Sequence, residues 1–175
     1  MKRFNVAKEC TYIAVFVALA IAGQLALSVL PNVEVVTVLF VCYAFVFGVR
    51  RGMVAATAFS LLRQLVFGFF PTVLALYLIY YNVLALSFGL LGRCKARGWK
   101  TLSFAVLLAC VCTAGFTLLD NVLTPLWYGY TKRAAQLYFA ASLPIMATHL
   151  LSVFITVALL FFPLTKAFAT VRSGL

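Results

Sequence analysis

Few side chains in this sequence could bind or react with a ligand, because the chain holds only three acidic residues and one histidine. Arg63, Asp120 and His149 each interrupt long apolar stretches, and Glu34 follows one. The sequence has neither a pair of aspartates nor an HExxH motif, so it is poorly supplied for metal-assisted hydrolysis. Ser142 near His149 is a weak basis for a nucleophile and its base. These residues favour binding of a polar ligand, and we expect that the chain is not an enzyme.

The candidate ligand-binding residues fall toward the same end of the predicted helices. They are Asn32, Glu34, Arg63, Tyr77, Tyr81, Asn82, Asp120, Asn121 and His149. Tyrosine rings suit a flat ring in a ligand, while Arg63 and His149 suit a carboxylate, a phosphate or a hydroxyl-rich ligand. A channel or a proton relay would place polar groups along the whole depth of the membrane. The sequence therefore predicts a pocket that opens at one end.

The composition indicates that these residues are held by helices in a lipid bilayer. The chain is 66% hydrophobic and only 10% charged, whereas a water-facing surface needs more polar side chains. A bilayer core about 30 Å thick takes about 20 apolar residues per helix, so 175 residues allow roughly six crossings. We predict an all-α integral membrane protein in which residues 1–175 form one six-helix domain. The net charge of +11 lies in short bursts along the chain, which argues against nucleic-acid binding.

Turn signals divide the chain into six apolar runs. The breaks are a Pro-Asn pair at 31–32, a loop at 48–52, a turn at 68–71, a basic loop at 92–100, a polar connection at 128–136, and Pro163 with Lys166. The predicted helices cover about residues 11–30, 35–47, 53–67, 72–91, 103–126 and 142–162. We interpret Gly48 and Gly52 as hinge residues of their loop.

The lysines and arginines predict the orientation, since such residues in short loops stay on the cytoplasmic side. Of the fourteen, Lys132 and Arg133 fall on one side of the predicted helices, and Arg63 lies within the third helix. All the others fall on the opposite side. We therefore predict that both termini are cytoplasmic and that the polar end of the helices faces outside.

Each candidate residue also has a purely structural interpretation. Glu34 and Asp120 lie close enough to the outer interface to be solvated. Arg63 could extend to the interface or pair with one of these acids, and His149 could hydrogen-bond a neighbouring helix. The candidate tyrosines lie four residues apart on one helical face and could belong to an aromatic belt. The shared location of the set favours a common pocket.

Alanine recurs at every fourth position of the first predicted helix, at Ala14, Ala18, Ala22 and Ala26. This spacing places small side chains on one helical face. In lipid, such a face lets the backbones of two helices approach closely. The face could pack against another helix of this chain, or it could dock another membrane subunit.

These features together resemble the S components of energy-coupling factor (ECF) transporters. The resemblance rests on the alanine series, the outer turn at 31–37, the Phe47–Gly52 loop and the Phe67–Pro71 turn in a six-helix chain of this size. An S component captures a vitamin or related micronutrient from outside. It docks through an AxxxA pattern on a transmembrane T component, which two cytoplasmic ATPases drive. The resemblance thus implies a bacterial plasma-membrane importer whose ATP is used by partner subunits, with no cofactor in this chain.

The resemblance also implies roles for individual residues. Ala14, Ala18 and Ala22 would be the docking series. Arg63 lies on the third helix, nominally in the docking half. Signature residues of the biotin, thiamine and riboflavin members are not found, so the resemblance does not identify the vitamin. The residues on elements that hold the ligand would be Asn32, Glu34, Tyr77, Tyr81, Asn82, Asp120, Asn121 and His149.

Two other classes of function are alternatives to this interpretation. A self-sufficient small transporter or channel would be favoured by polar residues in both halves of the membrane and by inverted repeats, and neither is found. A small membrane enzyme is the less favoured alternative, because the chain lacks paired acids and metal-ligand motifs.

Overall fold

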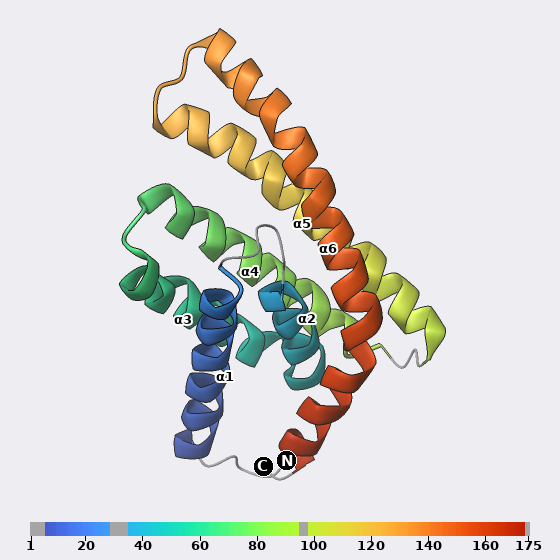
Figure 1. Cartoon of the computed structure of the whole chain (residues 1–175). Coiled ribbons are helices and arrows are strands. Elements are labelled where there is room, and N and C mark those ends of the chain that lie inside the picture. The colour runs from blue at the N-terminus through green and yellow to red at the C-terminus, as the bar shows by residue number, and fades with distance from the viewer. Residues whose placement is uncertain (1–5, 29–34, 95–97, 174–175) are drawn as a thin grey trace.

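The computed structural model describes residues 6–28, 35–94 and 98–173, and within these ranges every regular element is an α-helix. The all-helical part of the prediction is thereby confirmed. Figure 1 shows the helices, which are α1 (Val6–Ala26), α2 (Val35–Phe47), α3 (Val49–Phe67), α4 (Pro71–Leu91), α5 (Trp99–Trp127) and α6 (Lys132–Ser173).

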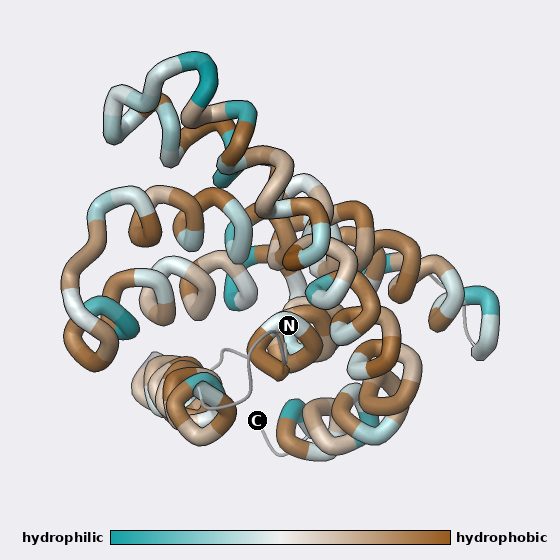
Figure 2. Tube along the Cα trace, turned by 45° about the horizontal axis from the view of Figure 1, so that its top comes forward, coloured by the Kyte–Doolittle hydropathy of each residue, from teal (hydrophilic) through white to brown (hydrophobic). Residues whose placement is uncertain are grey.

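Four of the described helices are long and apolar enough to cross a membrane, namely α1 from Ala7 onward, α4, α5 and α6. Helix α2 is apolar but has 13 residues, which span about 20 Å at 1.5 Å per residue. Helix α3 has 19 residues, and its content of Arg50, Arg51 and Arg63 lowers its hydropathy. Figure 2 shows hydrophobic residues along the length of the helices. The chain is accordingly a multi-pass membrane protein with four helices suited to spanning.

Helix α2 forms the centre of the core. Every residue of α2 except Val35 and Phe45 is buried, and the helix contacts α1, α3, α4 and α6. The ring centroid of Phe40 lies 5.0 Å from that of Phe16 in α1 and 5.2 Å from that of Phe59 in α3. A helix that is apolar on all sides gains most when every side is covered. This explains why the shortest helix is the most enclosed.

Gly48 alone separates α2 from α3, and its φ of 85° is a conformation that residues with a side chain rarely adopt. The predicted loop at 48–52 is therefore wrong, because residues 49–52 belong to α3. The hinge interpretation of Gly52 is wrong as well. A Cβ atom at Gly52 would lie 3.1 Å from the Cβ of Ala44 and 3.2 Å from that of Ala85, so this glycine lets three helices pack closely.

Helix α6 is twice as long as predicted, with 42 residues that include Pro144 and Pro163. The prediction ended this helix at Pro163 and began it at residue 142, and both boundaries are wrong. Proline removes one backbone hydrogen bond, but membrane helices tolerate this loss where neighbouring groups satisfy the backbone. Helix α5 likewise begins at Trp99, inside the predicted basic loop.

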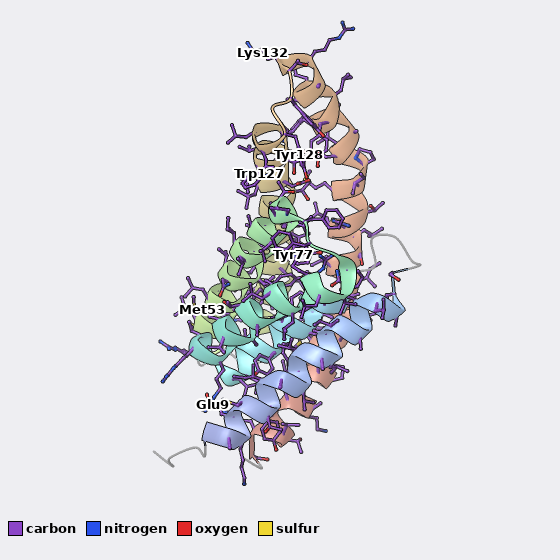
Figure 3. All side chains as sticks on the ribbon, turned by 90° about the vertical axis from the view of Figure 1, so that its left-hand side faces the viewer. Glu9, Met53, Tyr77, Trp127, Tyr128 and Lys132 are labelled. Carbon is purple, nitrogen blue, oxygen red and sulfur yellow. The ribbon has the colours of Figure 1, made fainter. Side chains whose placement is uncertain are left out.

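Charged residues hold together the end of the molecule at which α1 begins and α6 ends (Figure 1). Arg51 Nε donates to Glu9 Oε1 at 2.8 Å, which joins α3 to α1. Arg172 Nη1 donates to the Val46 carbonyl at 2.6 Å, which joins α6 to the last turn of α2. Figure 3 shows Lys132 at the opposite end from Glu9.

Candidate functional site

A first polar group surrounds the guanidinium of Arg63, where α1, α3 and α4 meet. Arg63 Nε donates to Gln24 Oε1 at 3.1 Å, and Gln24 Nε2 donates to the Tyr77 hydroxyl at 3.3 Å. The guanidinium carbon lies 4.5 Å from the ring centroid of Tyr77 and 4.7 Å from that of Phe67. Two aromatic faces thus compensate part of the lost hydration of this cation. We call Arg63, Gln24, Tyr77 and Phe67 the arginine group.

The arginine group keeps an unused donor. The Nη1 atom of Arg63 is buried and has no hydrogen-bond partner within the described ranges. A buried donor without an acceptor is costly, so an incoming acceptor such as a carboxylate would be stabilised here. The sequence left open that Arg63 pairs with an acid. In the structure Arg63 Nε bonds to Gln24 and Asp120 bonds to other residues, while Glu34, the other candidate acid, lies outside the described residues.

A second polar group lines a cavity between α5 and α6. The cavity has a volume of about 140 Å³. Asp120 is its acidic residue: Oδ2 accepts from the Tyr138 hydroxyl at 2.7 Å, and Oδ1 accepts from the Thr124 hydroxyl at 2.6 Å. The wall combines this carboxylate with His149, three hydroxyl groups and apolar side chains. The lining residues are Phe116, Thr117, Asp120, Tyr138, Ala141, Ser142, Ile145 and His149.

Asn121 stands beside this cavity. Its Nδ2 atom donates to Ser142 Oγ at 2.7 Å, and Ser142 Oγ donates to the Phe139 carbonyl at 2.8 Å. The Oδ1 atom of Asn121 is buried and has no partner among the described residues. Asn121 and Asp120 therefore present acceptor atoms at or next to the cavity.

Phe116 connects the two polar groups. Its ring centroid lies 6.1 Å from that of Tyr77 in the arginine group, and its side chain lines the cavity. Nearby, the Tyr80 hydroxyl is hydrogen-bonded to Thr113 at 3.1 Å and to Thr37 at 3.2 Å. These contacts join α5 to α4 and α2 on the N-terminal side of Phe116 in α5.

The predicted site residues thus divide among several places. Arg63 and Tyr77 lie in the arginine group, and Asp120 and His149 line the cavity, with Asn121 adjacent. The predictions for Asn32 and Glu34 lie outside the described residues.

The structure does not place two of the predicted residues in either polar group. Tyr81 is 3% exposed, and its ring packs against Phe40 and Phe59, so it is a core residue. Asn82 faces α3, where its Nδ2 donates to the Thr57 hydroxyl at 3.2 Å. The prediction placed both by their depth along the helix, which does not determine the face.

Sequence reasoning missed Gln24, Tyr138 and Thr117 as site residues. A signal for Tyr138 existed, because Tyr138, Ser142, Ile145 and His149 follow the spacing of one helical face. That signal was hidden by starting the sixth predicted helix at residue 142. Gln24 has no comparable signal, since its partners lie far away in the sequence.

The alanine face of α1 is exposed. Ala14, Ala18 and Ala22 all lie on the surface, whereas Phe16, Val17 and Ala20 of the same helix are buried. The alanine series therefore does not pack against the described helices of this chain, which was one of the two alternatives. This face leaves room for the close approach of another helix.

Comparison of the chain with models of known protein families, with curated proteins and with solved structures found no match.

Proposed function

We propose that this chain is the substrate-capturing subunit of an ECF-type importer, with the S-component-like arrangement of six membrane helices. The observation that carries the proposal is the presence of two separate surfaces on one small membrane protein. One is the cavity near the Lys132 end, whose mostly apolar wall includes Asp120 and His149. The other is the exposed alanine face of α1 at Ala14, Ala18 and Ala22.

In this proposal the cavity and the arginine group face outside, and both termini are cytoplasmic. The charge distribution supports that orientation, because Lys8, Arg51 and Arg172 belong to the end at which α1 begins and α6 ends. The membrane is the bacterial plasma membrane. The ligand is a water-soluble vitamin or a related micronutrient.

The energy for transport comes from partner subunits in this proposal. The alanine face of α1 docks a transmembrane T component, and two cytoplasmic ATPases hydrolyse the ATP. The chain itself is not an enzyme and needs no cofactor. The two polar groups support capture because each keeps a buried atom with no hydrogen-bond partner among the described residues, Arg63 Nη1 and Asn121 Oδ1.

Mass spectrometry of small molecules retained after gentle purification tests this function. The wild-type chain should retain a vitamin-like compound. Arg63→Ala and His149→Ala should retain much less of it, while Arg50→Ala, at an exposed position of the same helix as Arg63, should retain it fully. Undiminished retention by both site variants would exclude these residues from the site.

A further inference from the structure

We propose that the cavity between α5 and α6 binds a single ring that carries a protonated nitrogen, with the Asp120 carboxylate as its counter-charge. This inference rests on the proposed function only in treating the cavity as part of the capture site. It adds the chemical class of the captured group, which the importer proposal leaves open.

The size of the cavity suits one ring. Its volume is about 140 Å³. A dry cavity of about 150 Å³ in another protein accommodates benzene. One six-membered ring therefore fits between the lining side chains, and the exposed Ala141 and Ile145 leave the rest of a larger ligand room outside the cavity.

Among the described residues, no cation pairs with the carboxylate of Asp120. Both contacts that the structure gives it come from neutral hydroxyl groups, those of Tyr138 and Thr124. In the described ranges, the one ion pair joins Arg51 to Glu9 at the other end of the molecule. A carboxylate offers about four acceptor positions, so two positions stay open after these two bonds. A cation in an apolar surrounding would both fill them and neutralise the charge.

His149 in the wall can donate or accept, and the other neighbouring groups favour a donor over an acceptor. Asn121, which bonds to the lining residue Ser142, adds an acceptor, its Oδ1 atom, that has no partner among the described residues. The rings of Phe116 and Tyr138 in the wall offer aromatic faces, which attract cations. An anionic ligand would meet the Asp120 charge directly and be repelled. The arginine group, whose Nη1 atom has no partner in the described part of the chain, is the separate place for an anionic part of a larger ligand.

Three single-ring probes of nearly equal size test this assignment on the purified full chain. They are benzylamine, which is cationic at neutral pH, benzyl alcohol, which is neutral, and phenylacetate, which is anionic. The Kd of each is obtained from the dose dependence of its stabilisation of the protein against heat. We expect benzylamine to bind at least tenfold more tightly than either of the others.

Asp120→Asn keeps the shape of the side chain and removes its charge, so the Kd for benzylamine should rise at least tenfold. Glu9→Gln is the matched control, because Glu9 lies at the other end of the molecule. The Kd of this variant for benzylamine should equal that of the wild-type chain. Should Asp120→Asn fail to fold, the wild-type selectivity among the three probes decides alone. Equal binding of the three probes, preference for phenylacetate, or no binding of benzylamine would overturn the inference. Failure of the importer proposal would appear differently: the T component and the ATPases would not co-purify with the chain, while the selectivity among the three probes would remain.

Discussion

The Nε atom of Arg63 in α3 lies 3.1 Å from the Oε1 atom of Gln24 in α1, and this hydrogen bond joins the C-terminal parts of two helices that also form an ion pair near their N-terminal ends. The contact gives a half-buried cation a neutral partner. It also ties α1, the helix with the exposed alanine face, to the arginine group. The arginine group and the helix with the exposed alanine face are thus joined through the Gln24 side chain.

Removing the partner of Arg63 should destabilise the protein. Gln24→Leu leaves Nε of Arg63 without its acceptor, which should lower the free energy of unfolding by about 1–3 kcal/mol. Gln24→Glu should restore the bond, because a carboxylate accepts from a guanidinium more strongly. The free energies of unfolding of both Gln24 variants are measured by reversible unfolding in mixed micelles. Gln136→Leu, at an exposed position, is the control. If it lowered the free energy of unfolding as much as Gln24→Leu does, the account would be contradicted.

The Tyr138 hydroxyl should contribute to stability through Asp120. Tyr138→Phe removes the donor to Oδ2 but keeps the ring, so the free energy of unfolding should fall by about 1–3 kcal/mol. Tyr130→Phe, which alters an exposed neighbouring ring, should change it by less than about 0.5 kcal/mol. The same unfolding measurement compares the two, and equal effects would show that the Asp120 bond is not the cause.

Gly52 should tolerate no methyl group. Gly52→Ala adds a Cβ atom 3.1 Å and 3.2 Å from two alanine Cβ atoms, and overpacking of this kind costs about 1–3 kcal/mol. Gly115→Ala is the matched control, because nothing lies within 4 Å of the added atom. In α5 that change should be neutral or stabilising by up to about 1 kcal/mol. Thermal denaturation in detergent separates the two, and a neutral Gly52→Ala would refute the close packing of α3.

Much of the fold follows from the sequence, and its limits have physical causes. The range 35–47 was predicted with its observed bounds, because a proline-containing turn and a glycine enclose one apolar run. The full length of α6 could not be predicted from Pro163, since proline ends helices in water more strictly than in lipid. The role of Gly52 depends on Ala85, a residue of another helix, and no local pattern contains that contact.

For the candidate site, the sequence indicated which polar residues lie deep in apolar helices but not which of them face one another. Asp120 and His149 were predicted together and line one cavity. Arg63 was a candidate with an open choice of partner, and its bond to Gln24 depends on the packing of α1 on α3, which no local pattern contains. Tyr81 was predicted to line the pocket, and the choice of face was wrong.

Arg172 should stabilise the short central helix. Its Nη1 donates to the carbonyl of Val46 in the last turn of α2, where a cation also meets the negative end of the helix dipole. Arg172 is itself exposed, so Arg172→Ala should lower the free energy of unfolding by about 0.5–1.5 kcal/mol, through loss of the bond to Val46. Lys166→Ala, at an exposed position of the same helix, should have an effect near zero in the same assay. Equal losses would indicate a general effect of removing positive charge.

A bulky residue on the alanine face should separate capture from transport. Ala18→Trp should abolish uptake of the vitamin by cells, because the docking helix could no longer approach, while ligand retention by the purified protein stays normal. Leu19→Trp places the same ring on an exposed neighbouring position and should preserve uptake. Loss of both uptake and retention in Ala18→Trp would indicate a folding role for this face.

Purification of the tagged chain from native membranes in mild detergent, followed by identification of every co-purifying subunit, tests the central claim most directly. The account predicts one transmembrane T component and two ATPases in stable association, and their loss from the Ala18→Trp variant. A chain that purifies alone and transports its ligand when reconstituted without partners would contradict it.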